Sequence, residues 1–214
     1  MSKRMSVDKE KEPVPPRDFH RPEPNFHQAH IPMALPDPMS LLGFTDRWLA
    51  LGVVTRERVE ALGREFESSS DKNPEHYRYA AFRDYLAAHR PLQPAVAEAL
   101  YLLGEAGPDR GMGGAMTRDI ACLPECPSVV RDRALGSGER SLVAAVRQAV
   151  LIAELACGLT EELFDRCLTA ANGAVHRALV ARPELTRWQL ERIAEAGANR
   201  AVRNLAAVRL RGWR

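Results

Sequence analysis

Apolar positions in the second half of the chain follow a pattern that occurs twice. The first copy begins at Leu159-Thr160, and the second begins 26 residues later at Leu185-Thr186. In each copy, apolar residues then follow at helical spacing, and three further matches recur after 27 residues. These matches are Asn172 and Asn199, Val175 and Val202, and Arg182 and Arg209. A period of this length is typical of arrays of short paired helices.

Each copy predicts two helices of two to three turns. Thr160 and Thr186 precede the first helix of their copies and are predicted N-caps. Asn172-Gly173 and the matching residues 197–199 are predicted to stop that helix with a left-handed residue. Pro183 separates the copies because proline cannot continue a helix. Helices this short are marginal alone and must pack on their neighbours.

The pattern extends upstream in a weaker form. Ile120 and Val129 are nine residues apart, as are Ile193 and Val202, which predicts a third, degenerate unit. Between the units, residues 141–157 are apolar on almost every side. They predict a helix that is buried on most sides at the centre of the C-terminal half.

The whole chain is predicted to be all-α, with short paired helices stacked as an α-solenoid-like repeat array. We expect more than half of the residues to be helical and no sheet of three or more strands. Four segments follow from the pattern: an extended Pro-rich tail at 1–39, N-terminal helical hairpins at 40–106, a Gly-rich hinge loop at 107–114 and a C-terminal helical repeat array at 115–214. Phe19 and Phe26 within the tail leave open whether it packs on its own helices or on a partner, or is simply disordered.

Composition narrows the class of protein. A net charge of +2 and 45% apolar residues describe a globular chain without a strong electrostatic preference. No apolar run reaches the length of a membrane span, and the N-terminus has no signal core, so we expect a soluble cytoplasmic protein. From Arg131 onward, however, the chain contains 14 arginines and only nine acidic residues. This excess makes nucleic acid or phosphate a second candidate ligand.

One predicted helix carries the most reactive side chains. Glu75, His76, Tyr77, Arg78 and Arg83 lie within nine residues. Such a cluster can hold an anion or a proton-transfer pair. The alternative is a tyrosine-rich packing helix with a solvated charged side. His76, Arg78 and Arg83 are therefore candidate site residues, with no catalytic residue assigned.

No metal or cofactor is expected. His27 and His30 have ligand-like spacing, but nothing nearby completes a ligand set. Cys122 and Cys126 match no zinc pattern, and Cys157 and Cys167 are predicted on packed helical faces. The Gly-rich segment 107–114 precedes a helix, as phosphate-binding loops do, but it lacks the preceding strand and the Lys-Ser/Thr that follows.

The last helix is predicted to carry a basic edge. Four arginines fall within a quarter-turn of one face: Arg200, Arg203, Arg211 and Arg214. The opposite side holds the apolar Val202, Leu205 and Ala206. This edge is either an anion-binding surface for an acidic partner or phosphate backbone, or the solvated face of a capping repeat.

The recurring Leu-Thr, Asn, Val and Arg residues between Ile120 and Arg209 resemble those of HEAT-like and variant leucine-rich repeat proteins. The resemblance implies a right-handed superhelix with a concave binding face. Some variant leucine-rich repeat proteins carry an iron–sulfur cluster, but its dense cysteine motif is absent. Some HEAT-like proteins are DNA glycosylases, but their catalytic carboxylate and aromatic residues match no position here.

Three functions stay open at this point. The favoured hypothesis is a non-catalytic protein-interaction module, of the adaptor or inhibitor/immunity type, because no motif combines a nucleophile, a base and an orienting group. The alternative is a protein that binds nucleic acid or phosphate through its arginine-rich half. The third hypothesis is an enzyme with its site near His76.

Overall fold

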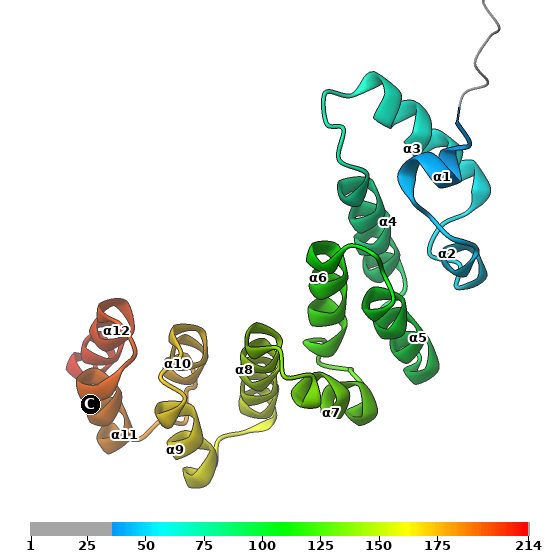
Figure 1. Cartoon of the computed structure of the whole chain (residues 1–214). Coiled ribbons are helices and arrows are strands. Elements are labelled where there is room, and N and C mark those ends of the chain that lie inside the picture. The colour runs from blue at the N-terminus through cyan, green and yellow to red at the C-terminus, as the bar shows by residue number, and fades with distance from the viewer. Residues whose placement is uncertain (1–35, 214) are drawn as a thin grey trace, which may run out of the picture. The chain divides into compact units, whose positions relative to one another are not determined.

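The computed structural model describes residues 36–213, which form twelve helices and no strand (Figure 1). The prediction of an all-α fold is therefore confirmed, and 72% of the structure is helical. Consecutive helices pack on one another in pairs, while their stacking as a solenoid stays a prediction. Most of the predicted tail lies outside the described residues, and the first helix begins at Pro38.

The N-terminal part contains five helices: α1 (Pro38–Leu42), α2 (Asp46–Ala50), α3 (Arg56–Ser68), α4 (Pro74–Ala88) and α5 (Pro94–Glu105). The C-terminal part contains seven: α6 (Arg110–Ala121), α7 (Ser128–Gly136), α8 (Arg140–Cys157), α9 (Glu161–Thr169), α10 (Gly173–Val180), α11 (Arg187–Ala196) and α12 (Arg200–Arg211). Several helices begin where a polar side chain satisfies a free amide. Thr55 accepts from the backbone N–H of Arg58 at 3.2 Å, and Asn73 accepts from that of Glu75 at 3.0 Å.

The predicted hinge loop at 107–114 is wrong, because α6 already begins at Arg110. Gly113 lies inside this helix and faces Gly104 of α5. A Cβ atom at position 113 would come within 2.4 Å of the Gly104 carbonyl oxygen. These glycines therefore allow α5 and α6 to pack closely. One hydrophobic core runs without interruption across this segment, from Leu42 to Val146.

The hydrophobic core divides within α8 instead. The first core ends at Val146 and the second begins at Leu151. Helix α8 packs against α6, α7, α9 and α10, so it joins the two cores. The predicted burial on most sides is wrong, because only four of its 18 residues are buried.

The predicted caps of the first helices are confirmed. Thr160 accepts from the backbone N–H of Leu163 at 3.1 Å, and Thr186 accepts from that of Gln189 at 3.2 Å. The repeated asparagines have a different role from the predicted one. Asn172 and Asn199 are the N-caps of α10 and α12. They start the second helix of each unit and do not end the first.

The third unit exists, but its register differs from the prediction by one residue. Val129 is 55% exposed, whereas Val130 is 1% exposed and takes the position of Val175 and Val202. In each unit the residue after this valine donates to backbone carbonyls in the last turn of the preceding helix or in the turn that follows it. Arg131 donates to the Leu123 carbonyl at 3.2 Å, and His176 donates to the Cys167 carbonyl at 2.9 Å. Arg203 donates to the Gly197 carbonyl at 2.7 Å.

His176 is fully buried and satisfied on both ring nitrogens. Its Nε2 donates to the carbonyls of Cys167 and Leu168, at 2.9 and 3.1 Å. Its Nδ1 accepts from the backbone N–H of Ala198 at 2.9 Å. The neutral ring therefore joins the end of α9 to the turn that precedes α12.

The two repeat-terminal arginines behave differently. Arg182 pairs with Glu184, with its Nε 2.9 Å from the carboxylate, so the pair is local. Arg209 donates to the carbonyls of Val180 and, at 2.7 Å, of Arg182. Thus the last helix is tied to the backbone of the preceding unit and not to an acidic side chain.

Two adjacent glycines test the packing of α5 on α6. Gly113→Ala should lower the free energy of unfolding by about 1–3 kcal/mol, because the added methyl group meets the Gly104 carbonyl. Gly114→Ala meets nothing within 4 Å and should raise it by roughly 0.5–1 kcal/mol through helix propensity. Urea unfolding measures both changes. Equal effects would contradict the close approach of these helices.

A second test concerns the histidine between the repeats. His176→Leu leaves buried carbonyls and the Ala198 N–H without their partner. The free energy of unfolding should fall by about 2 kcal/mol or more. The control is His89→Leu, which changes an exposed ring and should cost less than about 0.5 kcal/mol. If the two variants unfold at the same urea concentration, His176 does not stabilise the array.

Candidate functional site

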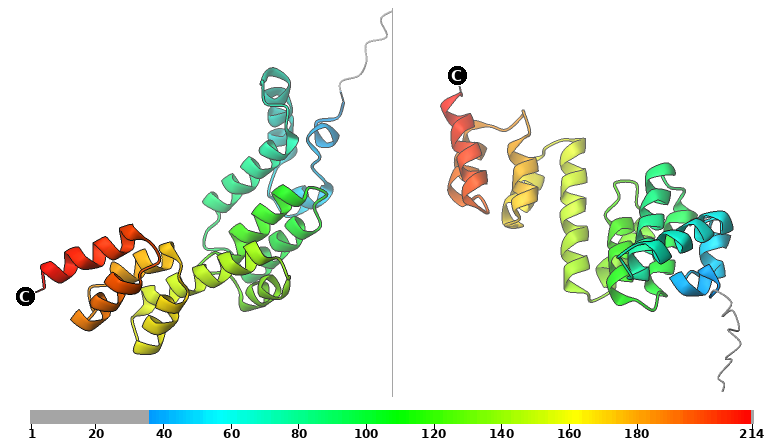
Figure 2. Two further views of the ribbon diagram at one scale, coloured as in Figure 1. Left: turned by 60° about the vertical axis from the view of Figure 1, so that its left-hand side comes forward. Right: turned by 90° about the horizontal axis from the view of Figure 1, so that it is seen from above.

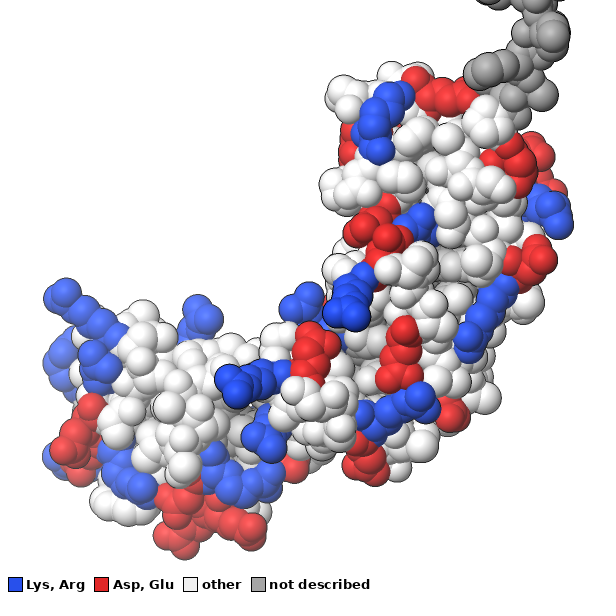
Figure 3. Space-filling model, in the orientation of Figure 1, with Lys and Arg blue, Asp and Glu red and all other residues white. Residues whose placement is uncertain are grey.

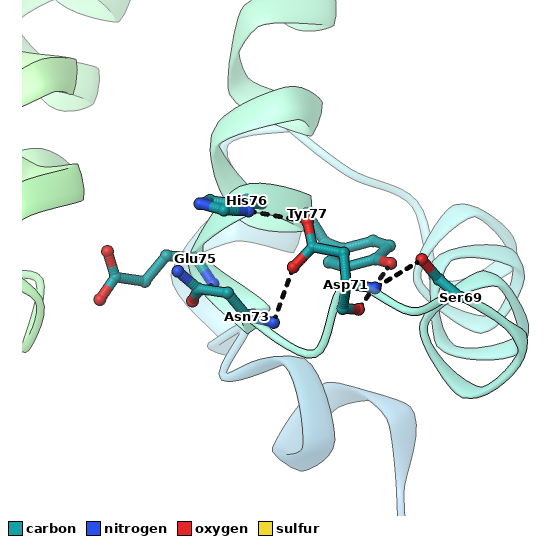
Figure 4. A network of polar contacts seen from close by, with 6 residues as sticks. All are labelled: Ser69, Asp71, Asn73, Glu75, His76 and Tyr77. Carbon is teal, nitrogen blue, oxygen red and sulfur yellow. Dashed lines mark hydrogen bonds and ion pairs between the residues drawn. The ribbon is translucent and has the colours of Figure 1, made fainter.

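His76 belongs to a polar network at the start of α4 (Figure 4). Its Nδ1 lies 2.7 Å from the Asp71 carboxylate. That carboxylate also accepts from the backbone N–H of Asn73 at 3.0 Å, and Tyr77 donates its hydroxyl to the Asp71 carbonyl at 3.1 Å. The hydrogen bonds from the Asn73 amide and from His76 hold the pKa of Asp71 below its usual value. The network fixes the turn that leads into α4.

The same network contains little that could act in catalysis. Ser69 accepts the Asp71 backbone N–H at 3.0 Å and does not contact His76, and the Tyr77 hydroxyl donates to the Asp71 carbonyl (Figure 4). Glu75 points away from the imidazole. His76 and Asp71 are both exposed, with side-chain exposures of 64% and 45%. The arrangement is therefore that of a helix cap in contact with solvent.

Arg78 and Arg83 do not converge with His76. Arg78 is buried and donates to the Leu42 carbonyl and to the Asp109 carboxylate, which ties α4 to α1 and to the start of α6. Arg83 is exposed and lies 3.7 Å from Asp119. The three candidate residues therefore lie in separate places: His76 at the start of α4, Arg78 in a buried ion pair and Arg83 in an ion pair at the surface.

The contrast between the two arginines can be measured. Arg78→Ala leaves the carboxylate of Asp109 without its cation and should lower the free energy of unfolding by about 3 kcal/mol. Arg83→Ala removes an exposed pair and should lower it by less than about 1 kcal/mol. Thermal unfolding followed by circular dichroism separates the two. A larger loss for Arg83→Ala would reverse this assignment.

The cysteines are free thiols. Burial raises the pKa of the thiols of Cys126 and Cys167 to about 11. Cys157 is exposed, so its predicted place on a packed face is wrong. Within residues 36–213, no group of three or more His, Cys, Asp or Glu side chains could hold a metal ion. The predicted ligand pair His27 and His30 lies outside the described residues.

The basic edge of α12 is only partly available to a ligand. Arg200 and Arg211 are exposed, but Arg203 donates its Nη1 to the Gly197 carbonyl at 2.7 Å. Arg214 lies outside the described residues. Leu205 was expected on the buried side, yet it is 47% exposed.

Within α9 to α12, acidic side chains lie only on the first helices, which also carry Arg166, Arg187 and Arg192. The second helices α10 and α12 contain no carboxylate. The first helices α9 and α11 contain five acidic residues: Glu161, Glu162, Asp165, Glu191 and Glu195. Figure 3 shows basic side chains over α12, and acidic and basic side chains intermixed over α9 and α11.

A groove of about 780 Å³ lies between α7, α8, α9 and α10. Its apolar lining consists of Leu135, Ala144, Val150, Leu151, Ala170 and Val175. Its polar lining consists of Arg147, Gln148, Glu162, Asp165, Arg166, Thr169 and Asn172. We refer to this hollow as the α8 groove.

The groove lies beside the long helix α8. Helices α7, α9 and α11 each pack on the helix that follows, and α8 lies between α7 on one side and α10 on the other (Figure 2). One face of α8 is left open between these neighbours. That face, with Ala144, Arg147, Gln148 and Leu151 at helical spacing, lines the groove.

Sequence reasoning missed this groove. Its lining residues come from four helices. Which helices meet is set by tertiary packing, and spacing along the chain does not encode it.

Most polar side chains at the groove have partners within the protein. Asn172 donates to Gln148 at 2.9 Å, Arg166 pairs with Glu154 at 2.9 Å, and Asp165 pairs with Arg192 at 2.6 Å. In the part of the chain that the structure describes, Arg147 and Glu162 form no ion pair. These two charges are opposite, so the rim is close to neutral.

No protein-family model, curated protein or solved structure matches this chain. Among residues 36–213, we find no helix with the length and apolar character needed to cross a membrane.

Proposed function

We propose that the chain is a non-catalytic protein-interaction module that binds an amphipathic helix of a partner protein in the α8 groove. The observation that carries this proposal is the open face of α8, which lines a groove with apolar residues from α7, α8 and α10. A helix from a partner would lie in this groove and cover these apolar residues. An adaptor or an inhibitor could work in this way.

The lining of the groove supports a helical ligand. Leu135 is 36% exposed at one end, and Val150 and Leu151 form an apolar floor. Amphipathic helices insert apolar anchors at spacings of three and four residues into grooves of this kind. The near-neutral rim means that burial of apolar surface, and not net charge, would supply most of the affinity. The free cysteines fit a reducing compartment, so we place this module in the cytoplasm.

The test is selection of amphipathic peptides from a display library with the full chain as bait. Selected peptides should bind the wild-type protein, and Leu135→Glu should weaken binding by about tenfold or more, since it puts a charge at an apolar anchor. The matched control is Val129→Glu, which changes an exposed apolar residue on the same helix, outside the groove. Calorimetry gives both affinities.

Two results would contradict the proposal that the α8 groove binds a partner helix. The first is a selection that yields no peptide whose affinity depends on Leu135. The second is an equal loss of affinity in Leu135→Glu and Val129→Glu, which would indicate a general effect on α7.

One observation favours the alternative function, the binding of nucleic acid or phosphate. The carboxylate-free helices α10 and α12 present exposed arginines, which suit phosphate oxygens. Against this alternative, the same surface exposes Leu205 and Val208, which gain nothing from a phosphate backbone. We therefore rank it second.

A further inference from the structure

A second surface, distinct from the α8 groove, lies on α10 and α12. Five arginines stand on these two helices with no carboxylate between them: Arg177, Arg200, Arg203, Arg209 and Arg211. Arg203 and Arg209 are engaged by backbone carbonyls. Arg177, Arg200 and Arg211 are exposed and form no ion pair with any residue in 36–213.

The same surface carries an exposed apolar stripe. Ala201, Leu205 and Val208 are spaced by four and three residues along α12, the C-cap Gly212 follows four residues later, and all four are exposed. This is the spacing of a helix-packing seam. The buried stripe of α12, with Val202 and Ala206, is separate and already faces the core. Thus α12 has one packed apolar face and a second one that no described residue covers.

Helix α10 extends the stripe. Ala178 and Ala181 occupy the repeat positions of Leu205 and Val208, 27 residues earlier, and α10 packs on α12. Arg177 lies next to these alanines in the sequence. Arg200 and Arg211 lie at the two ends of α12, to the side of the stripe that is nearer to Val208. We call this surface, made of the apolar stripe and its three exposed arginines, the α10–α12 face.

We propose that the α10–α12 face binds an amphipathic helix of a partner protein whose apolar stripe is flanked by carboxylates. Leu205 and Val208 would take the apolar side chains, and the three arginines would pair with the acids. The charge of the face argues for this occupant, because a single helix must match both the apolar centre and the cationic border.

Charge also argues against other occupants. A second copy that presented its own α12 would oppose arginine with arginine, since α12 contains no acid. A nucleic acid would satisfy the arginines but would leave Leu205 and Val208 against phosphate and sugar. The acidic helix is the one class that uses every part of the face.

The test compares two short designed helical peptides with the same apolar stripe, one flanked by glutamate and the other by lysine, added to the full chain. Fluorescence anisotropy at about 50 and about 300 mM salt should show binding of the glutamate peptide alone, weakened at high salt. Leu205→Asp should reduce its affinity by about tenfold or more. The triple variant Arg177→Gln, Arg200→Gln, Arg211→Gln should reduce it by about tenfold and remove most of the salt dependence.

Matched controls come from other parts of the chain. The triple variant Arg56→Gln, Arg110→Gln, Arg118→Gln removes three exposed arginines that also form no ion pair with described residues, and it should bind as the wild type does. Val129→Asp is the control for Leu205→Asp. Leu135→Glu should leave this binding intact, which separates the result from that for the α8 groove.

Three outcomes would overturn the proposal. Equal binding of both peptides, or of neither, would remove the role of charge. Tighter binding of a DNA duplex that is lost with the three arginines but unaffected by Leu205→Asp would make nucleic acid the ligand. Self-association in sedimentation that disappears in Leu205→Asp would make a second copy the occupant.

Discussion

The repeat units depend on how the first helix of each unit ends. The last turn of a helix leaves carbonyl groups without intrahelical partners. In three units the residue after the buried valine donates to carbonyls of this last turn or of the residues just after it. This residue is Arg131 in one unit, His176 in another and Arg203 in the third. Side chains of different chemistry satisfy the same need, because each carries an N–H donor on a suitable stem. Only His176 can also accept, and it thereby holds the next unit through Ala198.

This connection explains why helices of eight to twelve residues are stable here. Such helices are marginal alone, so each must be fixed by its neighbours. Buried Val175 and Val202 provide the apolar contact, and the adjacent donors fix the register of one helix against the next. Arg209 adds a bond between units through the Arg182 carbonyl.

The two proposed binding surfaces lie where packed helices leave apolar side chains accessible. The α8 groove lies between α7, α8, α9 and α10, and apolar residues of α7, α8 and α10 line it. The α10–α12 face exists because Leu205 and Val208 replace the smaller Ala178 and Ala181 of the preceding unit. Positions that match between the units stabilise the fold, and positions that differ between the units are candidates for function.

The sequence by itself determined the all-α class, the helix starts at Thr160 and Thr186, and the buried Val175 and Val202. These features are local, because capping and helical periodicity depend on residues within one or two turns. Tertiary structure decided the rest. Gly113 sits in a helix because it meets Gly104, Val130 and not Val129 is buried, and Arg203 is engaged by a carbonyl while Arg177 is exposed. Each of these outcomes is set by which surfaces meet when helices pack, and a residue's type and spacing do not encode that contact.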